Sequence, residues 1–330
     1  MQSSPLAGPA LVLLDHHDAG LRPPVLELLT AARTLGVPVH GAWLGAGLDP
    51  VLPALAAAGV ERIYRVGPGG GGADEAELGL TPVAAAALSQ LAVEGGASLV
   101  LLTSTFENKE IAARIGVRTG AGVVVDARAV VVEGGRVVTD KTVFAGTWNT
   151  RCAIVTPLAV VALKANSVQA EPAGAPTVPE VIGVAAPVGA RGVRVEERIE
   201  RPASGRPELS EAQVVVAGGR GTHGDFTALE DLADVLGAAV GATRVATDEG
   251  WIARDAQIGQ TGTTIAPRLY IGVGISGAVH HRGGMQAAGT IVAVNSDPES
   301  PIFEIADFGI VGDLFTVLPQ VTAELRRRKG

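Results

Sequence analysis

The sequence has few of the features that mark secreted or membrane-spanning proteins. Cys152 is the only cysteine among 330 residues, so no intrachain disulfide can form, which fits a reducing compartment and favours the cytoplasm. Residues 1–8 contain no basic segment followed by a long apolar core, so we expect no signal peptide. No run reaches about 18 apolar residues without a charge or a glycine, so we expect no direct membrane insertion.

Positive charge is also scarce. The chain has 26 Lys and Arg against 34 Asp and Glu, a formal net charge of -8, which argues against nucleic acid or an anionic membrane as the main partner. The one basic run, Arg326–Lys329, follows a helical pattern, and cations are favourable at a helix C-terminus. Aromatic residues make up only 3 % of the chain, whereas Ala, Val and Gly are abundant, which is typical of closely packed helices on Val- and Ile-rich strands.

The 330 residues, 47 % of them hydrophobic, are enough for two hydrophobic cores. In the first part of the chain, short apolar runs alternate with segments of helical spacing that end at glycines such as Gly36 and Gly59. This alternation indicates a parallel sheet with helices on both faces. The predicted strands are 10–14, 37–44, 61–66, 98–103 and 122–125, and the predicted helices are 24–36, 51–58, 82–94 and 108–116.

The pattern changes after about residue 126. Glu133-Gly-Gly135 predicts a hairpin turn, and the Pro- and Ala-rich segment 172–187 predicts an irregular connection because it has no periodicity. The predicted strands here are 127–133, 136–143, 151–156 and 192–199. We therefore divide the chain into an N-terminal α/β domain with added β-hairpins at 1–204, a linker at 205–212 and a C-terminal domain at 213–330.

The C-terminal domain returns to alternating strands and helices. We predict strands at 213–217, 270–275, 290–294 and 302–306, a short strand or turn at 244–247, and helices at 226–236, 277–288 and 314–328. The fold class is therefore α/β, with two domains that each have a mainly parallel sheet flanked by helices, and with a doubly wound C-terminal domain.

Several strands of this domain end in glycine and a small polar residue, as in open α/β sheets that bind a ligand at the carboxyl ends of their strands. Gly218-Gly-Arg-Gly221 allows close backbone approach, and Arg220 offers a cation suited to phosphate. Ser276 and Gly277 precede a helix, whose N-terminal N–H groups attract anions. Asn295 and Asp313 follow the next strands. A large phosphate-bearing ligand explains all of them, although a plain turn at 218–221 and helix caps remain open.

Two further features lie near these strand ends. Gly259-Gln-Thr-Gly262 places an amide and a hydroxyl between glycines, and the neighbouring Ile258 and Ile265 favour a loop packed against the core over a surface turn. His280 and His281 point about 100° apart on a helix, and no Cys or carboxylate has a supporting spacing, so we expect no metal site. One of the two histidines can face the ligand while the other faces solvent.

Seven blocks of the C-terminal domain together resemble the electron-transfer flavoprotein alpha subunit in order and spacing. The N-terminal domain resembles that family more loosely, through 29–36, 109–114 and Asp126. The seven blocks are Gly218–Gly221, Ala242–Asp248, Ile258–Gly262, Tyr270–His281, Ile291–Asn295, Pro301–Asp307 and Val311–Phe315.

The resemblance implies FAD in the C-terminal domain and a heterodimer with a beta subunit, which would hold AMP or, in a bifurcating protein, a second FAD. It implies an electron carrier without a substrate of its own, acting in fatty acid β-oxidation. Such a carrier takes electrons from acyl-CoA dehydrogenase-type flavoenzymes and passes them to a membrane quinone oxidoreductase. The N-terminal domain would then contribute to the subunit interface.

The matched positions also imply individual FAD contacts. Thr261 would hydrogen-bond flavin N5, Arg244 would lie against the isoalloxazine ring and His281 would lie near its N1/C2 carbonyl edge. Donors and cations at these places stabilise negative charge on the reduced ring and so tune its potential. The remaining cofactor-binding residues implied are Arg220, Ser276, Asn295 and Asp313 for the pyrophosphate, ribose and adenine, with Thr243, Gln260, Gly277, Ala278 and Leu314 close by.

The sequence departs from the family's usual pattern at four positions. Thr243, Thr263, His280 and Ser296 stand where the family usually has Ser, Lys, Gln and Lys. Thr243 keeps a hydroxyl, whereas the two missing lysines remove positive charge near the cofactor domain. Two other functions are alternatives: an adenine-nucleotide-binding α/β module without redox work, and a flavin-dependent dehydrogenase, for which the sequence shows no general-base motif.

Overall fold

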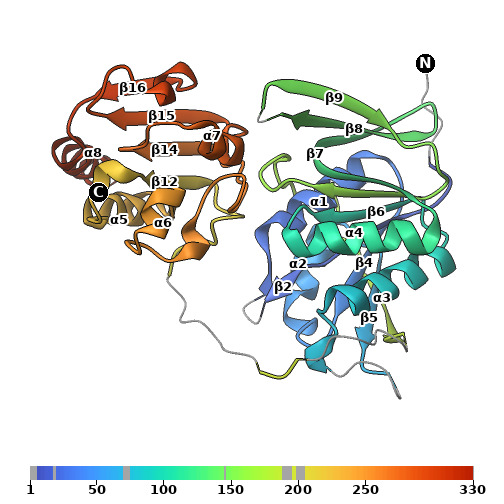
Figure 1. Ribbon diagram of the computed structural model, residues 1–330. Coiled ribbons are helices and arrows are strands. Elements are labelled where there is room, and N and C mark those ends of the chain that lie inside the picture. Colours follow the sequence, from blue (N-terminus) through green and yellow to red (C-terminus); the bar gives the residue numbers. More distant parts are fainter. Residues whose placement is uncertain are drawn as a thin grey trace. The chain divides into compact units, whose positions relative to one another are not determined.

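The structure, a computed structural model, describes residues 6–17, 20–69, 75–144, 146–187, 195–197 and 205–329. The chain forms two compact units (Figure 1), which we call the N-terminal unit (1–141 and 149–200) and the C-terminal unit (142–148 and 201–330). The strand predicted at 192–199 lies outside the described residues except for 195–197, which are not in a strand.

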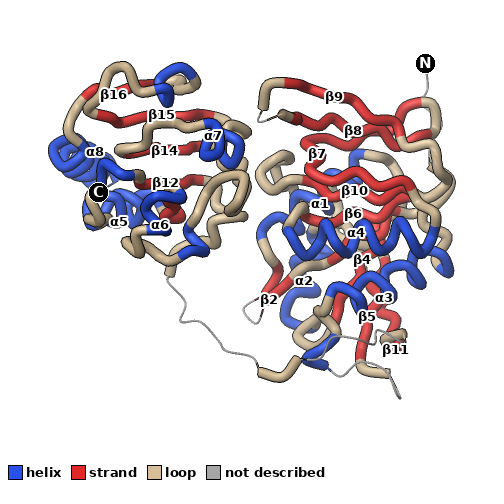
Figure 2. The backbone as a smooth tube through the Cα atoms, in the orientation of Figure 1, coloured by secondary structure: helices blue, strands red, loops and turns tan. Residues whose placement is uncertain are grey.

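The N-terminal unit is built on one nine-stranded sheet (Figure 2). All its pairings from β11 to β7 are parallel, and β7 and β8 are antiparallel. The strands, in sheet order, are β11 (Glu180–Ala185), β5 (Arg62–Gly67), β4 (Val39–Leu44), β1 (Ala10–Leu13), β6 (Leu99–Thr103), β10 (Ala159–Leu163), β7 (Gly122–Glu133), β8 (Arg136–Val143) and β9 (Trp148–Ala153). A small hairpin of β2 (His16–His17) and β3 (Gly20–Leu21) lies outside this sheet.

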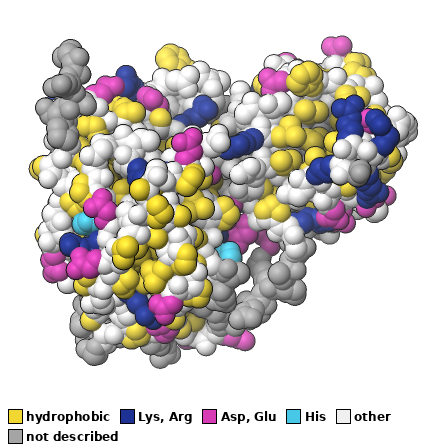
Figure 3. Space-filling view, turned by 180° about the vertical axis from the view of Figure 1, so that it is seen from behind, with side chains coloured by type: hydrophobic (Ala, Val, Ile, Leu, Met, Phe, Trp, Pro, Cys, Tyr) yellow, Lys and Arg dark blue, Asp and Glu magenta, His cyan; other side chains and the backbone are white. Residues whose placement is uncertain are grey.

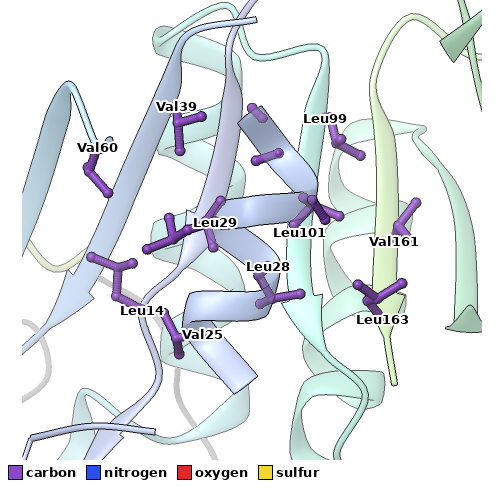
Figure 4. Packing of buried hydrophobic residues seen from close by; sticks show 14 of the residues in the cluster. Leu14, Val25, Leu28, Leu29, Val39, Val60, Leu99, Leu101, Val161 and Leu163 are labelled. Atoms are coloured by element: carbon purple, nitrogen blue, oxygen red, sulfur yellow. The ribbon is translucent and has the colours of Figure 1, made fainter. Parts of the chain in front are cut away.

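Helices cover both faces of this sheet, as predicted. α1 (Pro23–Thr34) and α2 (Leu52–Ala57) pack on one face, and α3 (Thr81–Glu94) and α4 (Phe106–Thr119) pack on the other. Figure 4 shows Leu28 and Leu29 of α1 against Leu101 of β6 and Val161 of β10. The central strands are buried on both faces, so their sequences read as continuous apolar runs rather than alternating ones.

The two strands predicted at 122–125 and 127–133 form one strand, β7. The register of β7 against β10 shifts near Asp126, which has a left-handed φ of 59°. The Asp126 carboxylate forms an ion pair with Lys109 of α4 at 2.7 Å and accepts a hydrogen bond from the Ser104 hydroxyl at 3.0 Å. The hairpin predicted at Glu133-Gly-Gly135 is confirmed, with positive φ at Gly134 and Gly135.

Two strands of this sheet were not predicted. β10 comes soon after a proline and is only five residues long, so its sequence shows no distinct hydrophobic periodicity. β11 lies inside 172–187, so the prediction of an irregular connection throughout was wrong: β11 lies at the edge of the sheet beside β5. Edge strands tolerate the prolines that flank it, because one side of the strand needs no hydrogen-bond partner.

The C-terminal unit contains a five-stranded sheet whose pairings are all parallel. Its order is β13 (Ala239–Ala242), β12 (Val214–Gly218), β14 (Leu269–Val273), β15 (Thr290–Asn295) and β16 (Phe308–Val311). α5 (Thr227–Leu236) and α8 (Leu314–Lys329) pack on one face through a core that includes Leu229 and Leu318. Ile258, Tyr270 and Met285 belong to the core on the other face, beside α7 (Val279–Met285). The predicted doubly wound α/β class is confirmed.

Three local predictions in this unit were wrong. Arg244–Asp248 forms a short helix, α6, instead of a strand or turn, and the unpredicted strand β13 precedes it. Residues 301–304 form a 3-10 helix that starts at Pro301, a residue favoured at the first position of a helix, and the strand lies later, as β16. α7 begins at Val279, two residues later than predicted.

On the face shown in Figure 3, charged and hydrophobic side chains are mixed over the described residues. α8 ends in the basic run Arg326–Lys329, as predicted, and Glu324 forms ion pairs with Arg327 and Arg328 at 2.6 and 2.8 Å. In the described part of the chain, no helix is long and apolar enough to cross a membrane.

Candidate cofactor site

The carboxyl ends of the C-terminal strands form the candidate site. The chain passes from β12 to β13 on one side and then to β14 on the other, so the strand order reverses between β12 and β14. In open α/β sheets the loops after two such strands separate and leave a crevice for a ligand. The loops after β12, β13, β14 and β15, together with the start of α8, carry most of the residues singled out by the sequence.

Glycines at the reversal point pack backbone against backbone. A Cβ added to Gly219 would lie 2.5 Å from the Gly274 carbonyl oxygen, and one added to Gly221 would lie 2.8 Å from the Gly274 Cα. The N–H groups of Gly219 and Gly221 donate to the carbonyl oxygens of Val273 and Gly274, both at 3.0 Å. No side chain fits between the two loops, so glycine is required at these positions for the loops to pack this closely. Arg220 projects from this loop and is exposed.

The loop after β13 carries Thr243 and Arg244. Arg244 opens α6, its side chain is 65 % exposed, and its Nε donates to the Asp248 carboxylate at 3.0 Å. Thr243 Oγ1 is buried and has no hydrogen-bond partner among the described residues. A buried hydroxyl without a partner is unfavourable, so this atom is suited to a partner that a ligand would supply.

The loop 258–263 follows a short bridge between Ala242 and Gln257. Thr261 and Gln260 are both exposed at its tip. Gln260 N donates to the His280 carbonyl oxygen at 3.0 Å, and Gly262 N donates to the Gly259 carbonyl oxygen at 3.1 Å. The first bond ties the loop to α7 and the second closes the loop on itself, in agreement with the prediction that it packs against the core.

The loop between β14 and α7 differs from the predicted helix start. Ala278 is the residue before α7, and no side chain caps the helix there, so Ser276 is not its N-cap. The Ser276 carbonyl oxygen instead accepts from Ile302 N at 3.0 Å and from the Ser300 hydroxyl at 3.2 Å. Gly277 has a φ of 80°, and a Cβ there would lie 2.6 Å from Ile302 N. The Ser276 and Ala278 side chains are exposed at the sheet edge.

His281 is buried, and both its ring nitrogens have partners. Nε2 lies 2.7 Å from the Tyr270 hydroxyl, and Nδ1 lies 3.2 Å from the Ile258 carbonyl oxygen. A carbonyl can only accept, so Nδ1 carries the proton and Nε2 accepts from Tyr270. Burial lowers the pKa of His281 to about 4 and raises the pKa of Tyr270 above its ordinary value. His281 is therefore neutral at pH 7, while the neighbouring His280 is exposed.

Asn295 and Asp313 are placed by their own hydrogen bonds. Asn295 Nδ2 donates to the Ile275 carbonyl oxygen at 2.9 Å and to Ser300 Oγ at 3.1 Å. The Asp313 carboxylate accepts from Phe315 N at 3.2 Å and so caps the start of α8, where Leu314 is buried. The cap interpretation therefore applies to Asp313, and its carboxylate remains exposed at the sheet edge.

The structure thus brings most of the predicted residues to one edge of one sheet. It buries His281, which the resemblance places near the flavin, against Tyr270 and the Ile258 carbonyl oxygen. Sequence reasoning also missed two partners: Tyr270 reads simply as part of an apolar strand, and Gln257 stands just before the glycine-bounded loop without a signal of its own. Within the described part of the chain, no group of three or more His, Cys, Asp or Glu side chains is arranged to hold a metal ion.

Comparison with known proteins accounts for both units. Residues 10–188 match the model of the electron transfer flavoprotein domain, and residues 208–286 match that of the electron transfer flavoprotein FAD-binding domain. The second match contains Arg220, Arg244, Thr261 and His281. It therefore supports FAD as the ligand of this edge of the sheet.

Three similar proteins, two of them matched over nearly their whole length, are all described as electron transfer flavoprotein alpha subunits. The electron transfer flavoprotein subunit alpha of Mycobacterium leprae is 42 % identical over 325 residues, which are 97 % of this chain and 99 % of the relative. The same subunit of Bacillus subtilis is 33 % identical over 327 residues, 96 % and 97 % of the two chains. The mitochondrial subunit of Dictyostelium discoideum is 53 % identical over 135 residues, 40 % of this chain and 38 % of the relative. The chain therefore belongs to the electron transfer flavoprotein alpha subunits, a family of FAD-containing electron carriers.

Proposed function

We propose that this chain is the FAD-holding subunit of a heterodimeric electron carrier. In this proposal the carrier takes electrons from acyl-CoA dehydrogenase-type flavoenzymes of fatty acid β-oxidation and passes them to a quinone oxidoreductase. The second subunit, an electron-transfer flavoprotein beta subunit, holds AMP or a second FAD. The single cysteine, which fits a reducing compartment, supports placing the carrier in the cytoplasm.

The observation that carries the proposal is the glycine-rich point between β12 and β14 at which the strand order reverses. Dinucleotides bind at such a point in open α/β sheets, and Gly219, Gly221 and Gly274 let the two loops meet there without side chains between them. The buried, unpartnered Thr243 Oγ1 supplies a polar atom that the chain itself does not satisfy. Both features fit a large polar cofactor at this edge. When bound, FAD supplies the redox centre that accepts and releases electrons.

The nucleotide end of FAD would be held by residues that the strand ends expose. Arg220 offers a planar cation for the pyrophosphate. Ser276 and Asn295 follow adjacent strands, and Asp313 and Leu314 lie at the start of α8, so they can share one extended ligand. Gly277 lets the loop between β14 and α7 pack closely against Ile302, and Ala278 follows it with a small side chain. Asn295 already ties this loop to 300–304 through two hydrogen bonds, which supports a positioning contribution as well.

The flavin ring would lie near Thr243, Arg244, Gln260 and Thr261. Arg244 would provide positive charge and Thr261 a hydroxyl donor for the reduced or oxidised ring. His281 would lie at the N1/C2 carbonyl edge as a neutral ring. Its Nε2 accepts from Tyr270, so a direct donation from His281 to the flavin would require that ring to leave one of its present partners.

We also propose that the domain boundaries follow the expected division, with 1–204 contributing to the subunit interface, 205–212 as linker and 213–330 as the FAD domain. Apart from 142–148, which belong to the C-terminal unit, the compact units divide at residue 200. The two family models end at 188 and begin at 208, which supports a boundary in this interval.

The test is to co-express the chain with a beta subunit, purify the complex and record its visible spectrum. A yellow heterodimer with one FAD in this chain is expected, and addition of an acyl-CoA dehydrogenase with its substrate should bleach the flavin. A colourless heterodimer that cannot be reconstituted with FAD would instead favour a nucleotide-binding module without redox work. A flavin that binds but is not reduced by the dehydrogenase would contradict the proposed electron donor.

A further inference from the structure

Gln257 is a buried polar residue beneath the exposed tip of the loop 258–263. Only 2 % of its surface is exposed. Its carbonyl oxygen accepts from Thr263 N at 2.7 Å, and the Gly262 Cα packs so close to that carbonyl that a Cβ would clash with it. Gln257 therefore lies at the point where the loop closes on itself.

The side-chain amide of Gln257 joins two threonines. The Thr247 hydroxyl of α6 shares its one proton between the Arg244 carbonyl oxygen at 2.9 Å and Gln257 Oε1 at 3.0 Å. Gln257 Nε2 donates to Thr261 Oγ1 at 3.0 Å. The amide thus connects α6, which carries Arg244, to the tip of the loop, which carries Thr261. Two elements on the proposed flavin side of the site are linked through one buried side chain.

This connection determines what the Thr261 hydroxyl can do. A hydroxyl has one proton to donate and lone pairs to accept with. Because its oxygen accepts from Gln257 Nε2, the Thr261 proton is free to be donated elsewhere, and the exposed side chain faces away from the core. A chain of hydrogen bonds that run in one direction also polarises its members.

The loop is also held by bonds that do not involve this amide. Backbone bonds hold the loop: Thr263 N to the Gln257 carbonyl, Gly259 N to the Thr263 carbonyl and Gln260 N to the His280 carbonyl. His281 Nδ1 adds a bond to the Ile258 carbonyl. These bonds shape the loop through its backbone and His281, whereas the Gln257 side chain bonds the two threonines.

We propose that Gln257 is a positioning residue that fixes the Thr261 hydroxyl as an outward donor to the flavin ring. The proposal rests on the proposed function, in which Thr261 contacts flavin N5. Gln257 itself does not touch the cofactor. It acts by occupying the Thr261 oxygen, so its effect on the flavin passes entirely through Thr261.

A double-mutant cycle on the FAD-loaded heterodimer tests this. The variants are Gln257→Leu, Thr261→Ala and the double variant, and the readout is the potential for addition of the first electron, from a redox titration followed by visible absorbance. Thr261→Ala is expected to lower the equilibrium constant for that step about tenfold, equivalent to 59 mV. Gln257→Leu should shift it in the same direction by several-fold, and should add nothing in the Thr261→Ala background.

Two further variants distinguish an effect on the flavin potential from a general defect in folding. Thr247→Val keeps the side-chain volume and removes the donor to Gln257 Oε1, so it should give a smaller shift of the same sign. Gln213→Leu makes the same chemical change at an exposed position before β12, at the opposite edge of the sheet, and should leave the potential unchanged. FAD content of each purified heterodimer is measured alongside.

The outcomes separate this proposal from the proposed function. If Thr261→Ala shifts the potential but neither Gln257→Leu nor Thr247→Val does, or if the Gln257→Leu shift persists without Thr261, the positioning proposal is wrong while the FAD site stands. If FAD binds but Thr261→Ala leaves the potential unchanged, both the Thr261 contact and the positioning proposal fail. A wild-type heterodimer that takes up no FAD overturns the proposed function itself.

Discussion

The His281 ring shows how burial decides the chemistry of one residue. Its folded pKa of about 4 lies below the ordinary 6.5, so between these values the unfolded chain binds a proton that the folded chain does not. Stability should therefore be complete above about pH 6.5 and fall as the pH drops towards 4. The loss is about 3 kcal/mol, because each pKa unit corresponds to 1.36 kcal/mol.

Urea unfolding at pH 7 and pH 4 measures this effect. His281→Gln should lose much of the additional acid sensitivity, because the group that must be protonated on unfolding is gone. His280→Gln is the matched control, since that neighbouring side chain is exposed and should leave the wild-type pH dependence intact. An identical pH dependence for wild type and His281→Gln would show that the ring does not contribute.

Arg244 carries the prediction on redox potential. If its guanidinium lies against the flavin, Arg244→Ala removes positive charge beside the ring and makes the flavin harder to reduce. A charge-assisted hydrogen bond is worth about 1.5–3 kcal/mol, so the expected drop is roughly 65–130 mV for one electron. Redox titration measures it. Arg254→Ala is the control, because Arg254 has the same charge, is 76 % exposed and also lies within 4.0 Å of Asp248. Equal potentials in both variants would contradict the assigned position of Arg244.

At the scale of elements, the loops after β12 and β14 are expected to tolerate no side chain at the glycines where they touch. Gly274 has a φ of 60°, and its Cβ would lie 2.8 Å from the Gly221 Cα. Gly237, at the end of α5, has a similar φ of 66° but open space around it. Gly237→Ala should therefore cost about 1–2 kcal/mol of stability from the left-handed backbone alone. Gly274→Ala should cost more and also weaken FAD binding, as measured by urea unfolding and FAD titration; equal costs would show that the loops can separate freely.

The helices and strands were largely predictable where the spacing of apolar residues and a glycine at the end of the segment indicated the same element. α1, α3 and α5 are followed by glycines, β12 and β14 run into glycines, and β1 is marked by its apolar run alone. β13 and β16 are four residues long with an internal glycine, which is too short for a period to appear, so their existence depends on pairing with β12 and β15.

The sequence predicted where the site residues lie but not the direction in which their side chains point. The sequence indicated that Thr261, Ser276, Asn295 and Asp313 lie near one sheet edge, because parallel strands end together. It gave no indication that His281 turns inward to Tyr270, because that choice depends on which ring fills the core beside Ile258. Motif position thus located the site, and packing decided which atoms remain available.

At the scale of the whole chain, each unit has hydrophobic cores of its own. We expect two thermal transitions in calorimetry, and FAD should raise only the one that belongs to the C-terminal unit. At a free FAD concentration 100 times the dissociation constant, the stabilisation is about 2.7 kcal/mol. Leu29→Ala, in the core under α1, should lower only the other transition. A single transition that moves as one in both experiments would show that the units unfold together.

The strand β11 has a consequence for how the chain reaches its native state. It completes the edge of the large sheet beside β5, with Glu180 opposite Arg62 and their side chains in an ion pair at 2.7 Å, although 118 residues separate them. Contacts between such distant segments are slow to form, because a long loop must close before they bring any gain. On the ribosome, β5 must therefore wait with one edge unpaired until residues 180–185 have emerged. Slowing synthesis between these two strands is expected to lengthen the time in which nascent chains can associate through that edge.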